Sequence, residues 1–519
     1  MSTLDEKLRH AIEREDWNGI TDFIGENWVS LVQDARGTLR DALNALPDEV
    51  VQGNARWVAA RDYVNFRPDA GAVRPLRFHH SPKGGPTGLL DVLAALTSRT
   101  ASDRYLGSFT RSIEAVREAH RTLAEVPDDA LDEIRPVLAE MRVQWAISLE
   151  FGGCLSDALH GFERTYDEAL AFDNKRAATG SAGSIAFIQG LHGDRAEMER
   201  WFARIPAVPP GIEGIPDTVS VMGHLAAALA AIDELDPEAA AAALERAPSD
   251  EVVPEQWAVR HYVEARLASK FGDPRAQLVR LRAARRSHIP ALSQGGINEW
   301  LLICGEGLLL MAAGDLRGSI LAVEPLRTSE AELAAETAAV VSAWALLRSG
   351  EPARAAALAG EHLVRTASPR TSAELLAVSA AACQELGEPA DAARSFASCL
   401  RVVLDQRLYT VLTRLQPDEL DSLVEAAGME IPAEVVLLLD RANRHTFPRR
   451  AAVQLSQRER VVLRHLIDGL STDQIALREH VSRNTVKTQT RSLFRKLEVS
   501  NRAEAVRLAV AQPELWAAS

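Results

Sequence analysis

Apolar residues recur at helical rather than strand-like spacing along most of this 519-residue chain. Residues 1–443 are rich in alanine, leucine, arginine and glutamate, which are all good helix formers. Stretches in which apolar and polar residues alternate, as they do in half-buried strands, are scarce. The pattern therefore predicts an all-α fold.

A short phrase recurs in this long region: an apolar helix ends at a glycine followed by an acidic residue, and an alanine-rich helix begins. The glycine permits the turn between antiparallel helices, and the acid favours the N-terminus of the next helix. The phrase occurs at Gly193-Asp194, Gly272-Asp273, Gly314-Asp315, Gly350-Glu351 and Gly387-Glu388, and Leu235-Asp236-Pro237 fills the gap between the first two. The last four glycines are 42, 36 and 37 residues apart (272 to 314, 314 to 350, 350 to 387). Two helices per unit of this length predict a helical-repeat solenoid.

Residues 454–519 predict four short helices. Two capping boxes mark helix starts: Ser456 with Glu459, and Ser471 with Gln474. Gly469 stands where the first of these helices needs a left-handed residue to end. A tight turn at His480-Val481 leads into the third helix, and a fourth begins at Asn501. Two helices joined by such a turn are typical of a helix-turn-helix.

The third helix has the character of a DNA-recognition helix. The hydroxyl of Ser482 can cap its first turn. The residues that we expect to pack inward are Val486, Thr490, Leu493 and Leu497, and those that point away from this seam are Lys487, Thr488 and Arg491. Lysine and arginine can donate to guanine O6 and N7, and a threonine methyl can touch thymine. A surface helix with ordinary solvated charges has the same pattern, so the helix alone does not distinguish it from a DNA-recognition helix. The neighbouring sequence distinguishes the two interpretations.

That neighbouring sequence resembles the LuxR-type DNA-binding domain. The matching positions are Leu455, Ser456, Arg458, Glu459, Val462, Leu463, Gly469, Ser471, Ile475, Ala476, Val481, Ser482, Thr485, Val486, Lys487, Lys496, Leu497, Val499, Arg502 and Ala505. The resemblance implies that double-stranded DNA is a partner, usually bound by a homodimer on a two-fold site. The DNA-binding residues that it implies are Ser482, Asn484, Thr485, Lys487, Thr488, Gln489, Arg491 and Arg495, with base contacts from Lys487, Thr488 and Arg491.

Two positions depart from the family pattern. Gln489 stands where the family often has histidine, and glutamine can still donate to a phosphate. Glu479 stands where the family usually has leucine, and Leu477 is the residue that could take over its packing.

The long region resembles tetratricopeptide repeats, with longer and looser units. Residues 39–50 look like the opening of the repeat region in MalT-like regulators, which couple such repeats to a LuxR-type C-terminus, normally behind an NTPase module. No G-x-x-x-x-G-K-[ST] motif occurs in this sequence. The glycine cluster at residues 83–88 has its lysine on the wrong side and a proline in the loop. We therefore expect no NTPase module.

The charge of the chain is unevenly distributed. From Pro448 to the end there are 13 Lys and Arg against 7 Asp and Glu, a net charge of +6. The whole chain carries -14, so the remainder carries -14 - 6 = -20. A basic module favours phosphate binding, which supports DNA contact by the C-terminal region only.

Other classes of protein find no support in the sequence. There is no run of 18 apolar residues and no signal-peptide core, so we expect a cytoplasmic protein without membrane contact. The four cysteines form no C-x-x-C pair. His79-His80 could be a metal pair, but adjacent histidines without a nearby Cys or acid cluster are more often solvated. No G-x-S-x-G or H-E-x-x-H motif occurs, so we expect no enzyme, no metal site and no cofactor.

The sequence thus predicts a repeat domain at residues 1–443, a linker at 444–453 and a DNA-binding domain at 454–519. The leading interpretation is a sequence-specific transcriptional regulator whose repeats sense an unknown small-molecule or protein effector. The alternative is a protein-interaction adaptor that its C-terminal domain tethers to DNA.

Overall fold

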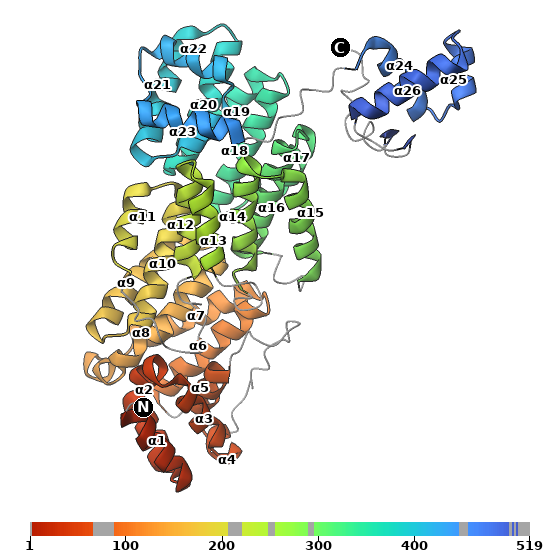
Figure 1. The fold of residues 1–519 in the computed structure, drawn as a ribbon. Helices are drawn as coiled ribbons and strands as arrows, with labels where there is room; N and C mark the ends of the chain where they lie inside the picture. Colours follow the sequence, from red (N-terminus) through yellow and green to blue (C-terminus); the bar gives the residue numbers. More distant parts are fainter. Residues whose placement is uncertain are drawn as a thin grey trace. The chain divides into compact units, whose positions relative to one another are not determined.

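The computed structural model describes residues 3–65, 88–205, 221–247, 255–288, 295–445, 455–497, 501–502 and 505–506. The regular secondary structure of these residues is helical throughout, with no strand among them, and this confirms the all-α class. The chain divides into two compact units, residues 1–443 and 444–519, which are described separately (Figure 1). Residues 446–453 of the expected linker lie outside the described residues.

The first five helices form a cluster with a core of its own. They are α1 (Thr3–Glu13), α2 (Trp17–Asp34), α3 (Arg36–Ala45), α4 (Asp48–Gln52) and α5 (Ala55–Asn65). Ile20 and Ile24 on α2 and Leu39 on α3 are fully buried in this core. Helix α5 then packs against α6, which joins the cluster to the repeats.

Sixteen further helices of the described chain form the repeat region. They are α6 (Leu89–Tyr105), α7 (Phe109–Ala124), α8 (Asp128–Phe151), α9 (Leu155–Ala171), α10 (Lys175–His192), α11 (Arg195–Phe202), α12 (Val221–Asp233), α13 (Pro237–Arg246), α14 (Trp257–Phe271), α15 (Pro274–Ser287), α16 (Gly296–Ala312), α17 (Leu316–Val323), α18 (Glu332–Arg348), α19 (Pro352–Leu363), α20 (Pro369–Glu385) and α21 (Pro389–Gln406). Each even-numbered helix from α8 to α20 contacts the next even-numbered one, and each odd-numbered helix from α9 to α21 packs beside its predecessor. This is the stack of helix pairs that the repeating phrase predicts (Figure 1).

The expected glycine–acid junctions lie between the paired helices. The junction glycines with a left-handed backbone are Gly193 (φ 77°), Gly314 (87°), Gly350 (78°) and Gly387 (77°). The acids whose side chains cap the following helix are Asp194, Asp236, Asp273 and Asp315. Gly272 is the exception, because its φ of −125° is open to any residue. In the junction that lacks glycine, Leu235 takes the left-handed conformation (φ 63°).

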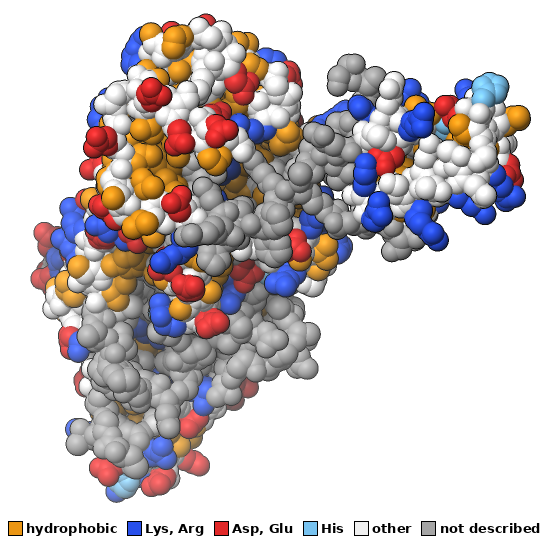
Figure 2. All heavy atoms as spheres, turned by 45° about the horizontal axis from the view of Figure 1, so that its top comes forward, with side chains coloured by type: hydrophobic (Ala, Val, Ile, Leu, Met, Phe, Trp, Pro, Cys, Tyr) orange, Lys and Arg blue, Asp and Glu red, His pale blue; other side chains and the backbone are white. Residues whose placement is uncertain are grey.

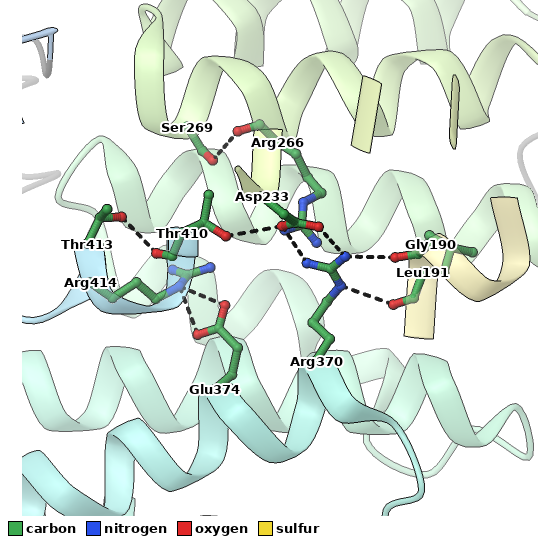
Figure 3. A network of polar contacts seen from close by, with 10 residues as sticks. All are labelled: Gly190, Leu191, Asp233, Arg266, Ser269, Arg370, Glu374, Thr410, Thr413 and Arg414. Carbon is green, nitrogen blue, oxygen red and sulfur yellow. Dashed lines mark hydrogen bonds and ion pairs between the residues drawn. The ribbon is translucent and has the colours of Figure 1, made fainter. Parts of the chain in front are cut away.

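Helices far apart in the sequence meet inside the repeat unit. Helix α10 contacts α20, α8 contacts α16, and α12 contacts the short 3₁₀ helix η3 (Tyr409–Arg414). The remaining elements of this unit are η2 (Glu324–Leu326), α22 (Pro417–Ala427) and α23 (Ala433–His445). The inner ends of α10, α12, α14 and α20 therefore surround a common interior (Figure 3).

The C-terminal unit contains α24 (Gln457–Ile467), α25 (Thr472–Arg478) and α26 (Arg483–Leu497). Both α24 and α25 pack against α26. Their shared core includes Val462, Leu463, Ile475, Val486 and Leu493, none of which is more than 2% exposed. The expected fourth helix is described only at residues 501, 502, 505 and 506, where Ala505 is buried in the same core.

Candidate nucleic-acid interface

Local hydrogen bonds begin and end α24 and α25 as the sequence predicts. Both capping boxes are formed, one by Ser456 with Glu459 and one by Ser471 with Gln474. In each, the serine hydroxyl accepts from the third backbone N–H of the helix while the longer side chain accepts from the N–H of the serine. Gly469 follows α24 with a left-handed φ of 82°. These contacts fix the two helices on which the third one packs.

The turn between α25 and α26 is short and tightly bonded. His480 has a left-handed backbone (φ 53°), which is uncommon for a residue other than glycine. The N–H of Val481 returns to the carbonyl of Ala476 at 3.0 Å. The Ser482 hydroxyl then accepts from the N–H of Thr485 at 3.1 Å, so Ser482 caps α26 as predicted.

One face of α26 is anchored in the core of the unit. Val486, Leu493 and Leu497 are at most 1% exposed, as the apolar spacing predicts. Thr490 is only half-buried and lies at the edge of this face. The anchored face fixes which side chains of α26 remain on the surface.

The opposite face of α26 presents cationic and polar side chains. The predicted DNA-binding residues that are exposed are Ser482, Asn484, Lys487, Thr488, Arg491 and Arg495, whereas Thr485 and Gln489 are half-buried. With the other described residues, Lys487, Arg491 and Arg495 form no ion pair. Figure 2 shows Lys and Arg side chains gathered on the visible face of this unit. Cations on a fixed helix that are not neutralised by neighbouring acids are suited to a phosphate-rich partner.

Two hydroxyl groups of α26 are already engaged within the helix. The Thr488 hydroxyl donates to the carbonyl of Asn484 at 2.9 Å, which leaves its methyl group and oxygen lone pairs for outside contacts. The hydroxyls of Ser482 and Thr485 are 2.8 Å apart and bond to each other.

Glu459 ties the first turn of α24 to the last turns of α26. Its carboxylate accepts from Lys496 Nζ at 2.6 Å and from the Ser492 hydroxyl at 2.9 Å, besides the backbone N–H of Ser456. Burial by itself would raise the pKa of this carboxyl, but the bonds from Lys496, Ser456 and Ser492 outweigh it and lower the pKa to about 2. Lys496 is therefore bound within the domain, a role that the sequence pattern alone does not reveal.

A second polar contact holds the turn. His465 Nε2 on α24 lies 2.6 Å from Oε1 of Glu479, the residue that ends α25. The expectation that Leu477 would take over the packing at this position is wrong, because Leu477 is 79% exposed. The imidazole instead gives the glutamate a polar partner. Arg502 adds a further support, since its guanidinium donates to the carbonyls of Leu466 and Leu470 at the end of α24.

Other sequence candidates add no site to the part of the chain that the structure describes. No group of three or more His, Cys, Asp or Glu side chains is arranged to hold a metal there. His79, His80 and residues 83–87 lie outside the described residues. The four cysteines are free thiols. None of the described helices has the length and apolar character needed to cross a membrane.

Comparison with known proteins gives matches of two kinds. Residues 453–509 match the family of bacterial regulatory proteins known as the luxR family. The probable transcriptional regulatory protein SgaR of Hyphomicrobium methylovorum is 52% identical over 56 residues, which are 11% of this chain and 26% of that protein. The uncharacterized transcriptional regulatory protein YhcZ of Bacillus subtilis (strain 168) is 32% identical over 99 residues, 18% of this chain and 46% of that protein. The chain thus spans less than half the length of either relative.

Among solved structures, the tetratricopeptide domain of P58(IPK) is aligned with 68% of this chain and 98% of its own, at 16% identity and a TM-score of 0.20. The description of the repeats as a tetratricopeptide-like stack therefore rests on the helix pairs and their junctions.

Proposed function

We propose that this chain is a sequence-specific DNA-binding transcriptional regulator, starting from the finding that its residues 453–509 match the luxR family of bacterial regulatory proteins. The observation that carries the proposal is the outward face of α26. There Lys487 and Arg491 are exposed one helical turn apart, on a helix whose other face is fixed in the core. A helix presented in this way can enter the major groove.

Base contacts in this proposal come from three side chains. Lys487 and Arg491 donate to guanine O6 and N7, the commonest specific contact in the major groove. Thr488 contributes its methyl group to thymine, because its hydroxyl proton is held by the carbonyl of Asn484. Phosphate contacts come from Ser482, Asn484, Thr485, Gln489 and Arg495, which position the helix without reading sequence.

The repeat unit is the proposed sensor. A small-molecule or protein effector would favour one arrangement of the chain by a few kcal/mol, which is enough to change DNA occupancy. We further propose that the protein acts in the cytoplasm and binds a two-fold site as a homodimer.

Genome-wide enrichment of DNA fragments with the intact protein tests this function. Wild type is expected to enrich a shared, roughly two-fold motif, and Lys487→Ala/Arg491→Ala is expected to lose it. Arg354→Ala/Arg394→Ala is the matched control, because these two arginines are exposed on the repeat unit (69% and 74%). Failure of wild type to enrich any motif, with and without cell extract as a source of effector, would contradict the proposal.

A further inference from the structure

A small cavity lies among the inner helices of the repeat unit. Its volume is about 30 Å³, and its polar lining includes Tyr262, Arg266, Trp300, Arg370, Glu374 and Arg414. One water molecule needs about 10 to 15 Å³ measured in this way. The cavity therefore has room for about two or three water molecules, or for a compact bonded group of similar size.

The charges beside the cavity do not balance. Arg370 forms two hydrogen bonds with the Asp233 carboxylate, at 2.7 and 2.6 Å, and Arg266 contacts the same carboxylate at 3.2 Å (Figure 3). Arg414 and Glu374 form a second, balanced pair at 2.9 Å. Three guanidinium groups thus face two carboxylates, which leaves one positive charge in excess.

Arg266 and Arg370 share one carboxylate. Arg370 also donates to the carbonyls of Gly190 and Leu191 at the end of α10. Arg266 shares Asp233 with Arg370 and Thr410, and Tyr262, which also lines the cavity, is a further hydrogen-bond partner of Arg266. The two guanidinium groups thus have a single carboxylate between them. A buried charge without a counter-charge is costly. A negatively charged ligand in the cavity would supply the missing charge.

Trp300 provides an independent observation. It lines the cavity and is 3% exposed, and its indole Nε1–H has no hydrogen-bond partner among the described residues. Trp344 differs, since its Nε1–H donates to Glu374 at 2.7 Å; Trp201 and Trp257 resemble Trp300 in having no partner for Nε1–H among the described residues, but only Trp300 lines the cavity. A buried donor without an acceptor calls for one, and a ligand in the cavity would supply it.

We infer that this cavity binds the carboxylate group of a small organic acid, which accepts a hydrogen bond from Trp300 and neutralises the excess positive charge of the three arginines. A carboxylate group with its adjoining carbon is small enough to suit the cavity. It also brings the negative charge and the acceptor atoms that the cavity lacks. Such a ligand would touch α14, α16 and α20 at once and so bridge helices that are distant in sequence. Its role as the effector rests on the proposed function, but its binding does not.

Acetate is the probe, and the intact protein is titrated in chloride-free buffer at an ionic strength held constant by a large sulfonate salt. Acetate is expected to raise the unfolding temperature saturably, with a Kd of about 0.1 to 10 mM for a ligand of four heavy atoms. Acetamide, which is neutral and of the same size, is expected to have no such effect. Equal effects of the two, or no saturable effect of acetate, would overturn the inference.

Two variants locate the binding. Trp300→Phe removes one donor at nearly unchanged volume and is expected to weaken acetate binding about tenfold. Arg266→Gln removes the excess charge but keeps the Asp233–Arg370 pair, and it is expected to abolish binding. Arg282→Gln is the matched control, since Arg282 is 46% exposed and pairs with Glu306 on the outside. Unchanged binding by Trp300→Phe and Arg266→Gln would place acetate elsewhere and refute the site. If Arg266→Gln does not fold, Trp300→Phe decides.

The same titration with Lys487→Ala/Arg491→Ala separates this inference from the proposed function. This variant is expected to bind acetate as wild type does even though it no longer enriches DNA. Loss of acetate binding in this variant would contradict a site inside the repeat unit.

Discussion

Lys496 Nζ lies 2.6 Å from a carboxylate oxygen of Glu459, and this contact joins the last turn of α26 to the first turn of α24. The same carboxylate closes the capping box of α24. One side chain therefore fixes both the start of a supporting helix and the position of the helix proposed to read DNA.

Replacement of Glu459 by Gln should destabilise the C-terminal unit by about 1–3 kcal/mol, because the charged acceptor of Lys496 and Ser492 is lost. The pKa of Glu459 is about 2 in the fold, below its ordinary value of 4.5. Its stabilising effect is thus complete above pH 4.5 and disappears as the pH falls toward 2. Hydrogen exchange of residues 457–497 as a function of pH measures both effects. Asp473→Asn is the control in the same unit, since Asp473 pairs with Arg483 at the surface and should change little.

Glu479 and His465 should show a measurable coupling. Removal of either side chain leaves the other, at the junction of α24 and α25, without its 2.6 Å partner. A double-mutant cycle with His465→Ala and Glu479→Ala should give an interaction free energy of about 0.5–2 kcal/mol at neutral pH. Stabilities that add without a coupling term would show that the contact does not support the turn.

Asp233 should be far more sensitive than a surface acid. Burial would raise the pKa of its carboxyl, but Arg370 and Arg266 outweigh burial and lower the pKa below the ordinary value of 3.8. Asp233→Asn leaves two buried guanidinium groups without a counter-charge and is expected to cost about 3–5 kcal/mol in urea unfolding. Asp391→Asn, at an ion pair whose acid is 52% exposed, should cost less than about 1 kcal/mol. Similar losses in the two variants would rule out the interior network as a major support of the repeat unit.

Two junction glycines provide a matched pair of substitutions. Gly193 and Gly350 have nearly the same left-handed φ, 77° and 78°. A Cβ at Gly193 would lie 2.8 Å from the Cβ of Arg370, whereas a Cβ at Gly350 would have no atom within 4 Å. Gly350→Ala should therefore cost about 1 kcal/mol from backbone strain alone. Gly193→Ala should lower the free energy of unfolding by at least about 1 kcal/mol more than Gly350→Ala does. Thermal unfolding of the two variants measures this difference. Equal losses would mean that α10 and α20 do not approach closely.

Local signals predicted the fold of the C-terminal unit well. The capping boxes at Ser456 and Ser471 and the cap at Ser482 depend on residues three positions apart, so the sequence contains both partners of each bond. The same holds for the junction acids Asp194 and Asp315. The outward face of α26 follows from the apolar spacing that buries Val486 and Leu493.

Non-local contacts could not be predicted in this way. Asp233 and Arg370 are 137 positions apart, and nothing in either helix reveals that the stack brings α12 and α20 together. The pairing of Lys496 with Glu459 spans 37 positions. The expectation for Leu477 failed for a similar reason, because the partner that Glu479 finds is a histidine on another helix.

The most direct test of the central claim compares the affinity for an enriched two-fold site with that for a scrambled site, over a series of salt concentrations. Wild type should prefer the enriched site strongly, with an affinity that falls steeply as salt increases. Lys487→Ala/Arg491→Ala should lose at least about thirtyfold on the enriched site and little on the scrambled one, since two base-reading side chains are gone. Arg354→Ala/Arg394→Ala should match wild type. If the Lys487→Ala/Arg491→Ala protein still discriminated between the two sites as wild type does, α26 would not be the element that reads DNA.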